Sequence, residues 1–291
     1  MKISQLLEEK KITVSCELFP PKKGGELEKA KTVVREMAKL NPAYMSVTYG
    51  AGGTNSGNTV EIANEIQNVN HVTALAHLTC VSSEREQVRR VLAELRSLGI
   101  ENILALRGDM PMEEGLALSS CFHHASDLMQ EIREFGGFCV GGACYPESHP
   151  ESSSFEQDIE SLKRKADSGC DFLTTQMFFD NDILYNFMFR LLRAGVQIPV
   201  VAGIMPVTNS RQIQRICALS GTALPRRFRM IVDRFADDPA AMEQAGIAYA
   251  TDQIIDLFAN GVEHVHIYTM NRPDVAGRIM QNLSDIIHPL N

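Results

Sequence analysis

The chain has 291 residues, of which 44% are hydrophobic and 22% are charged, and this length suits either two average domains or one eight-stranded α/β barrel. The formal net charge of −8 argues against nucleic acid or an anionic membrane surface as a partner, because both require a concentrated basic face. No segment has the features of a signal peptide or reaches about 18 consecutive apolar residues, and the seven cysteines have no CxxC spacing. We therefore expect a cytoplasmic protein with reduced thiols.

Short apolar runs alternate with longer amphipathic segments along the whole chain. The predicted strands cover residues 13–19, 44–49, 72–78, 102–106, 138–144, 172–176, 200–204 and 264–269. Several of them are apolar at nearly every position, as expected for parallel strands that are covered by helices. The predicted helices cover residues 27–40, 59–68, 84–98, 125–135, 155–168, 182–194, 211–220, 239–259 and 275–287, with an extra helical segment near 224–235.

Glycines mark the ends of several predicted helices, and the next apolar strand follows each of them. We expect left-handed C-caps at Gly99, Gly169, Gly195 and Gly261. About eight strand–helix units use up the chain, which predicts one α/β domain over residues 1–291: a (β/α)8 barrel with an extra helical segment before the last helix–strand unit. A doubly wound sheet is the alternative, but its glycine-rich fingerprint is missing after the first strand.

Polar side chains recur at the carboxyl ends of the predicted strands, where barrels of this class build their active sites. A single residue of this kind would be explained by loop solvation, but a convergent set predicts a functional site. The set comprises Glu17, Thr48, Tyr49, His77, Arg107, Gly108, Asp109, Tyr145, His149, Gln176, Tyr268, Asn271 and Arg272.

The two carboxyl groups in this set, Glu17 and Asp109, have different predicted surroundings. Glu17 lies in an otherwise apolar strand, so it either forms a buried ion pair with Arg107 or has a raised pKa that lets it donate a proton near neutrality. Asp109 follows Arg107 at a strand end. A pair of this kind suits a general acid and a group that stabilises a cation.

Two further patterns leave alternatives open. His264 and His266 share one strand face and suggest a metal pair, but no third ligand is evident, so we predict no metal. Asp158, Ser161 and Lys165 fall on one helical face, which is either solvated or places a carboxylate on a ribose and cations on phosphates.

Short sequence blocks, among them CELFPP, LRGDMP and YPESHP, occur along the chain at 16–21, 46–51, 76–80, 106–111, 145–150, 162–165, 175–180, 203–207 and 268–272. In this order the blocks together resemble the short bacterial methylenetetrahydrofolate reductases, which are flavoprotein (β/α)8 barrels. The likeness extends from about residue 12 to residue 272.

The resemblance implies noncovalent FAD at the strand ends, where a cationic island of Arg107, Arg164 and Lys165 would meet its phosphates. It implies that Glu17 is the general acid toward the folate, that Asp109 stabilises the folate cation, and that Thr48, Gln176, Gln212 and Arg272 contact the folate or the nicotinamide cofactor. The implied flavin contacts are Tyr49, Ala51, His77, Arg107, Gly108, Asp109, Ala125, Tyr145, His149, Ser152, Asp158, Ser161, Arg164 and Lys165.

The implied activity is the reduction of 5,10-methylenetetrahydrofolate to 5-methyltetrahydrofolate with NADH or NADPH, by ping-pong hydride transfer through FAD, in one-carbon metabolism and methionine biosynthesis. A homo-oligomer is expected by family likeness. Ile216 in place of an aromatic residue, His124 in place of Tyr, and the 51–55 loop depart from the family pattern. They leave open a flavin subunit that takes electrons from a partner protein. A metal-dependent barrel hydrolase and a catalytically silent binding module are less favoured alternatives.

Overall fold

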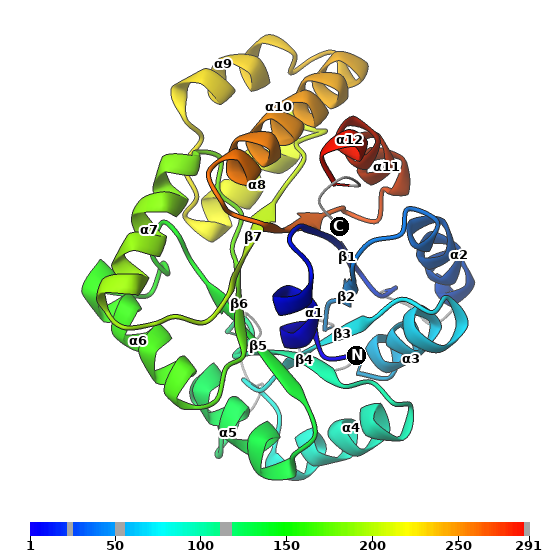
Figure 1. The fold of residues 1–291 in the computed structure, drawn as a ribbon, viewed down its shortest axis with the longest axis vertical. Helices are drawn as coiled ribbons and strands as arrows, with labels where there is room; N and C mark the ends of the chain where they lie inside the picture. Colours follow the sequence, from blue (N-terminus) through cyan, green and yellow to red (C-terminus); the bar gives the residue numbers. More distant parts are fainter. Residues whose placement is uncertain (22–25, 50–55, 111–117, 288–291) are drawn as a thin grey trace.

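The computed structural model describes residues 1–21, 26–49, 56–110 and 118–287 (Figure 1). Within them, parallel strands form a closed barrel in chain order. The strands are β1 (Thr13–Leu18), β2 (Met45–Val47), β3 (Ala74–Thr79), β4 (Asn102–Leu106), β5 (Cys139–Cys144), β6 (Phe172–Thr175), β7 (Val200–Ile204) and β8 (His264–Tyr268). Pairing of β1 with β8 closes the barrel and sets Glu17 opposite Tyr268. The predicted fold class is confirmed.

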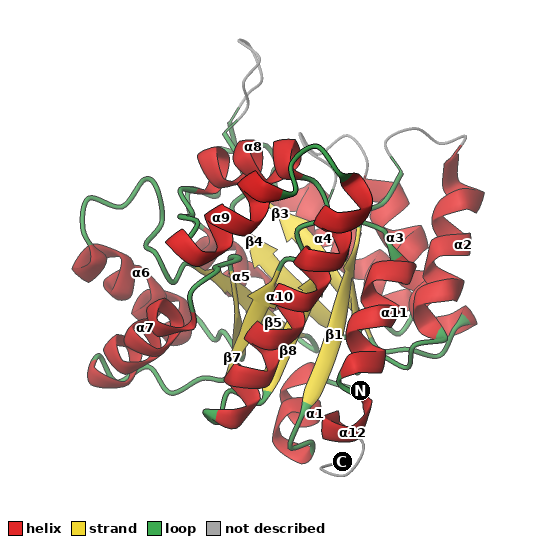
Figure 2. Ribbon diagram, turned by 90° about the horizontal axis from the view of Figure 1, so that it is seen from above, coloured by secondary structure: helices red, strands yellow, loops and turns green. Residues whose placement is uncertain are grey.

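An outer ring of helices covers the strands (Figures 1 and 2). It consists of α2 (Leu27–Ala38), α3 (Ser56–Asn64) with the π-helical turn η3 (Glu65–Val69), α4 (Arg85–Ser97), α5 (Ala125–Phe135), α6 (Phe155–Asp167), α7 (Asn181–Arg193), α10 (Pro239–Ala259) and α11 (Pro273–Asn282). The predicted glycine caps are confirmed, since Gly99, Gly169, Gly195 and Gly261 have φ angles of 70°, 89°, 79° and 81°.

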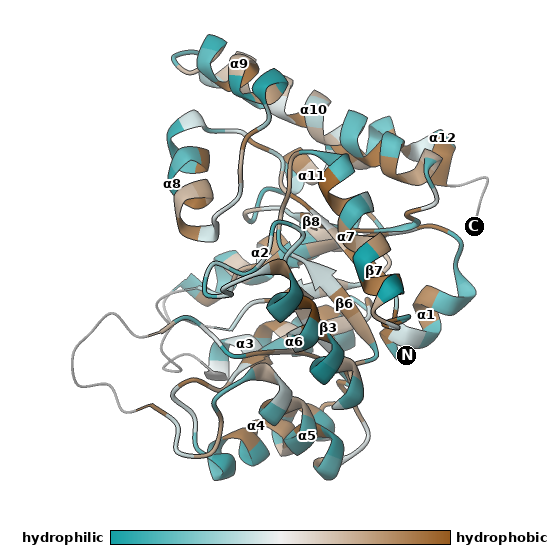
Figure 3. Cartoon of the chain, turned by 90° about the vertical axis from the view of Figure 1, so that its left-hand side faces the viewer, coloured by the Kyte–Doolittle hydropathy of each residue, from teal (hydrophilic) through white to brown (hydrophobic). Residues whose placement is uncertain are grey.

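Hydrophobic and hydrophilic residues are interspersed along most of the helices (Figure 3), as expected for helices that pack one face against the strands. The side chains between the strands and the ring form the main apolar core, to which β1, α4 and α5 contribute Leu18, Leu92 and Leu128. Among the described helices, none combines the length and the apolar character that a membrane span requires.

The amino-terminal helix α1 (Ile3–Glu9) was not predicted from the sequence. It lies across the amino-terminal mouth of the barrel (Figures 1 and 2). Its buried Ile3, Leu6 and Leu7 pack with Tyr44 and Phe172 of the barrel in a second apolar cluster. Seven residues are too few for a clear helical period, and burial in the barrel mouth supplies the stability that the segment lacks alone.

The last predicted helix, 275–287, is in fact two helices, α11 and α12 (Ser284–Ile287). They are separated by Leu283, which is fully buried and forms the C-cap of α11. Packing of this leucine into the core interrupts a segment whose apolar spacing alone reads as continuous.

Between β7 and β8 the chain forms three helices rather than one. Of these three helices, α10 belongs to the outer ring, where it packs between α7 and α11. The predicted extra segment is α9 (Arg226–Arg234), and α8 (Ser210–Ser220) lies beside it above the carboxyl ends of the strands (Figure 2). Their apolar side chains, including Ile213, Phe228 and Val232, pack with Met242 of α10 and with residues after β6 and β7 in a cluster separate from the main core.

Candidate active site

A cleft of about 410 Å³ opens at the carboxyl ends of β4 and β5. The start of α5 and one face of α6 form its walls. It is lined by Ala105, Leu106, Arg107, Gly108, Asp109, His124, Ala125, Ser126, Ala143, Tyr145, His149, Glu151, Ser152, Gln157, Asp158, Ser161, Leu162, Arg164 and Lys165. Most of the residues expected to contact a flavin are therefore brought together. Tyr49 and His77 are not among the lining residues, and Ala51 lies outside the described part of the chain.

The α6 wall forms because residues three and four apart share a helix face. Asp158 is buried and accepts a hydrogen bond from Ser152 Oγ at 3.3 Å, and its desolvation raises the pKa of this carboxyl. Lys165 donates from Nζ to the Ala143 carbonyl at 2.6 Å, and desolvation lowers the pKa of its ammonium group. With Ser161 beside them, these residues face the cleft, so the alternative of a fully solvated face is wrong.

The β4 end contributes a guanidinium group and a tight turn. Arg107 Nη1 and Nη2 donate to the two carboxylate oxygens of Glu151 at 2.6 and 2.7 Å. Gly108 follows with a φ of 90°, and a Cβ there would lie 3.1 Å from Thr79 Cβ and 3.2 Å from Val81 Cγ1. Because Arg107 pairs with Glu151, the alternative of a buried Glu17–Arg107 ion pair is wrong.

The charges of the cleft are balanced rather than cationic. Arg107, Arg164 and Lys165 gather there as predicted, but among the described lining residues three carboxylates accompany them: Asp109, Glu151 and Asp158. The expected cationic island is therefore wrong in its simple form. Sequence spacing could not show this balance, because Glu151 belongs to a different strand–helix unit from Arg107.

Glu17 is a buried carboxyl group on β1, inside the barrel rather than in the cleft wall. Burial raises its pKa to about 8. Its ionisable neighbour is His77 of β3, whose Nε2 lies 3.8 Å from Glu17 Oε2 and has no hydrogen-bond partner among the described residues. Burial lowers the pKa of His77 to about 3, so this ring is neutral and Glu17 is protonated near neutral pH.

Serine and threonine hydroxyls hold the two histidines of β8. His266 is hydrogen-bonded at Nδ1 to Ser15 Oγ at 2.7 Å and at Nε2 to Ser46 Oγ at 3.0 Å. His264 Nδ1 lies 3.0 Å from Thr13 Oγ1. No group of three or more His, Cys, Asp or Glu side chains in the described residues is arranged to hold a metal ion. Both ring nitrogens of His266 are thus engaged by serine hydroxyls.

The residues expected to contact substrate are spread around the rim. Thr48 and Gln176 follow β2 and β6, and Gln212 lies on α8 next to Ile216 at a narrow pocket of about 10 Å³. Arg272, after β8, donates to Asp274 at 2.5 Å and to Glu243 at 2.8 Å. None of these four residues lines the cleft.

Four polar cleft residues were not predicted as site residues from the sequence. They are Ser126, Gln157, Glu151 and His124, and the last of these stands out in the sequence only by its departure from the family pattern. The signal for Glu151 is weak but present, since it directly follows the YPESHP block.

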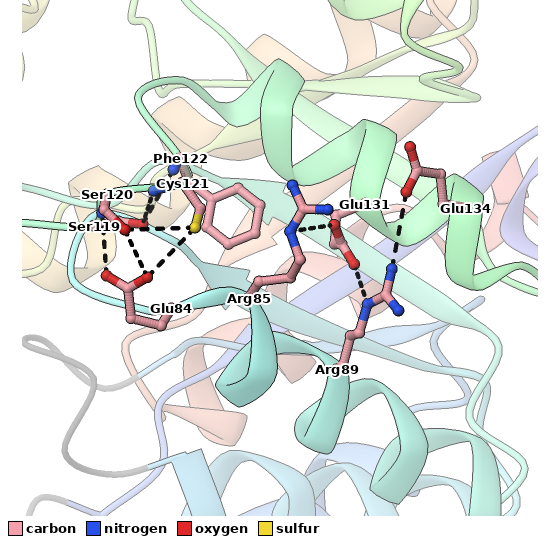
Figure 4. A network of polar contacts seen from close by, with 9 residues as sticks. All are labelled: Glu84, Arg85, Arg89, Ser119, Ser120, Cys121, Phe122, Glu131 and Glu134. Atoms are coloured by element: carbon pink, nitrogen blue, oxygen red, sulfur yellow. Dashed lines mark hydrogen bonds and ion pairs between the residues drawn. The ribbon is translucent and has the colours of Figure 1, made fainter.

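A network of polar contacts positions the loop that leads into the α5 wall (Figure 4). The Glu84 carboxylate accepts from Ser120 N at 3.1 Å, from Ser120 Oγ at 2.9 Å and from Cys121 Sγ at 3.4 Å. Close by, the buried carboxylate of Glu131 on α5 pairs with Arg85 and Arg89 of α4. These contacts fix α5 against α4, and α5 in turn places Ala125 and Ser126 at the cleft.

Comparison with known proteins identifies the family of this chain. Residues 2–284 match the family model for methylenetetrahydrofolate reductase. The 5,10-methylenetetrahydrofolate reductases of Pectobacterium carotovorum subsp. carotovorum and Escherichia coli (strain K12) are 34% and 32% identical to this chain, each over 94% of this chain and 90% of the relative. Methylenetetrahydrofolate reductase (NADH) 1 of Arabidopsis thaliana is 33% identical, over 97% of this chain and 50% of that longer protein.

A solved structure supports the fold. An uncharacterized protein from Clostridium thermocellum, described as binding two copies of 5-methyl-5,6,7,8-tetrahydrofolic acid, superposes with a TM-score of 0.63 at 13% identity and covers 99% of each chain. The sequence matches extend over nearly all of the described barrel, including the strand ends that build the cleft. The chain therefore belongs to the methylenetetrahydrofolate reductase family of oxidoreductases.

Proposed function

We propose that the chain reduces 5,10-methylenetetrahydrofolate to 5-methyltetrahydrofolate in a ping-pong reaction, with NADH or NADPH as the electron donor and FAD as a noncovalent cofactor. The observation that carries the proposal is Glu17, a buried carboxyl group that stays protonated near neutral pH at the carboxyl end of β1. The plant relatives named for NADH and the fold neighbour described with methyltetrahydrofolate give further support.

The cleft residues fit a dinucleotide cofactor. Arg107, Arg164 and Lys165 supply donors for phosphates, and the buried Asp158 supplies an acceptor for a ribose hydroxyl. Gly108 allows close approach because no Cβ fills the turn. The remaining proposed contacts are Tyr49, Ala51, His77, Asp109, Ala125, Tyr145, His149, Ser152 and Ser161. Held by these residues, FAD would supply the hydride chemistry that links the nicotinamide to the folate.

The chain's own residues then handle the proton and the developing charge. Glu17 donates a proton to a nitrogen of the folate ring bridge, which opens the bridge to an iminium cation. Asp109, an exposed carboxylate at the end of β4, stabilises that cation. Thr48, Gln176, Gln212 and Arg272 contact the folate or the nicotinamide at the rim. Arg272 would do so while Glu243 and Asp274 hold its guanidinium group.

The two half-reactions can be tested separately in Glu17→Gln. Its bound flavin should still be bleached anaerobically by NADH or NADPH, whereas transfer to the folate should fall by about 10²–10⁴-fold because the proton donor is gone. Glu65→Gln is the matched control, since Glu65 is also buried but pairs with Arg35 outside the site. Normal folate reduction by Glu17→Gln would refute the assignment.

A flavin subunit that takes electrons from a partner protein is the second candidate function. Ile216, which stands where an aromatic residue is expected, lines the narrow pocket beside Gln212 and offers no ring on which a nicotinamide could stack. Anaerobic mixing of the purified protein with NADH and then NADPH decides the question. Bleaching by either supports the nicotinamide route, and a flavin that neither reduces supports the partner.

A further inference from the structure

We propose that Glu151 is an affinity-setting residue of the cleft, whose carboxylate competes with the cofactor phosphates for the guanidinium group of Arg107. This inference rests on the proposed function, because it assigns the cleft to a phosphate-bearing dinucleotide. Glu151 takes no part in the chemistry described above. Its proposed action is to set how tightly the cofactor binds, through Arg107.

The geometry of the pair is that of a phosphate contact. Both carboxylate oxygens of Glu151 meet the two terminal nitrogens of Arg107, at 2.6 and 2.7 Å. Arginine binds phosphate oxygens through the same fork of parallel N–H groups. The Glu151 carboxylate therefore stands where a phosphate would make its two strongest bonds to Arg107.

The side chain of Glu151 is freer to move than that of Arg107. The side chain of Arg107 is 25% exposed and is also held by its Nε, which donates to the Gly108 carbonyl at 3.3 Å. The side chain of Glu151 is 56% exposed, while its backbone N–H donates to His149 Nδ1 at 3.1 Å. The carboxylate can therefore rotate into solvent while the backbone of both residues and the guanidinium group stay in place.

Because the charges of the cleft are balanced, replacement of the Glu151 carboxylate by a phosphate on Arg107 should affect cofactor affinity. The three cationic groups of the cleft face three carboxylates, so an incoming dianion gains no net positive field while Glu151 stays on Arg107. Displacement of Glu151 frees one full positive charge for the phosphates. Arg164 donates to Ser161 Oγ at 2.7 Å and Lys165 to the Ala143 carbonyl, so within the described residues these two cations are held by neutral oxygens instead.

Cofactor binding to full-length variants tests the proposal by flavin fluorescence titration. Glu151→Gln should bind FAD about two- to fivefold more tightly, which is the range expected for loss of one partly exposed competing ion pair. Glu151→Asp keeps the charge but shortens the side chain, so it should also tighten binding because the two-pronged contact is lost. Glu156→Gln is the control, because Glu156 is exposed on α6 and does not line the cleft.

The gain should vanish when Arg107 is removed. In an Arg107→Ala background, Glu151→Gln should leave FAD affinity unchanged, because no guanidinium group remains to compete for. Weaker or unchanged binding by Glu151→Gln would overturn the proposal, as would an equal gain in Glu156→Gln. Titration with inorganic pyrophosphate repeats the comparison without a flavin. A wild-type chain that binds pyrophosphate but no FAD would refute the proposed function. The effect of Glu151→Gln on pyrophosphate affinity would still test the role of Glu151 independently.

Discussion

At the scale of single residues, burial without a nearby positive charge sets the protonation state of Glu17. Among the described residues, the ion-pair neighbour of Glu17 is His77, and that ring is kept neutral by its own burial. The folded protein therefore raises the pKa of the carboxyl from an ordinary 4.5 to about 8. Desolvation alone therefore keeps this carboxyl group protonated near neutral pH.

This pKa predicts a pH dependence for one half-reaction only. Glu17 is protonated below a pH of about 8 and loses its proton above it, so hydride transfer to the folate should slow as the pH rises through that value. Reduction of the flavin by the nicotinamide needs no proton from Glu17 and should show no such fall. Stopped-flow measurement of each half-reaction across this range provides the check. A folate rate that increases with pH would count against Glu17 as the donor.

Some residue contacts could not be predicted because they join distant parts of the chain. The helical face of Asp158, Ser161 and Lys165 follows from spacing alone and is found lining the cleft. The pairing of Arg107 with Glu151 joins residues 44 positions apart. His266 posed the same difficulty, because its serine partners lie on β1 and β2, at the other end of the chain.

At the scale of elements, α10 packs closely against the loop that follows β7. A Cβ at Gly246 of α10 would lie 1.8 Å from the Val207 carbonyl oxygen, so only glycine allows this contact without a backbone shift. The strand and helix order was predictable from periodicity, whereas this contact depends on how α10 crosses the loop. Sequence pattern therefore identified the helix but not the reason for its glycine.

Gly246→Ala should separate α10 from the loop and destabilise the protein. The expected loss is about 1–3 kcal/mol or more in the free energy of unfolding, as for other overpacked sites with rigid neighbours. Gly57→Ala is the control, because Gly57 lies in α3, where an alanine methyl group would have no described atom within 4 Å and alanine favours the helix. Urea unfolding of both variants measures the difference. Equal stabilities would show that the loop adjusts freely.

At the scale of the whole molecule, the two ends of the barrel differ in character: one is closed by apolar packing and the other carries the polar cleft. The amino-terminal mouth is closed by α1 and its apolar contacts, and the polar cleft lies at the carboxyl ends of the strands. Periodicity predicted the barrel and the end that carries the site. It did not predict α1, because that helix is defined by the cavity it covers rather than by its own pattern.

Stability and cofactor binding should therefore respond to different ends. Leu6→Ala removes a buried side chain of α1 and should cost about 2–5 kcal/mol of unfolding free energy while leaving FAD affinity unchanged. Leu219→Ala, at a leucine that is 74% exposed, should change neither quantity. Thermal or urea unfolding and a flavin titration of each variant supply the two measurements. A large loss of FAD affinity in Leu6→Ala would show that the two ends are coupled.

The apolar cluster to which α8 and α9 contribute extends to the narrow pocket beside Gln212. Ile213, Phe228 and Val232 pack among themselves and against the loops after β6 and β7, in a cluster distinct from the main core of the barrel. Ile216 of α8 packs at the edge of this cluster and also lines the narrow pocket beside Gln212. A substitution that repacks Phe228 or Val232 should therefore alter the packing of Ile216 and the shape of that pocket, while the core between the strands and the outer ring is a separate cluster.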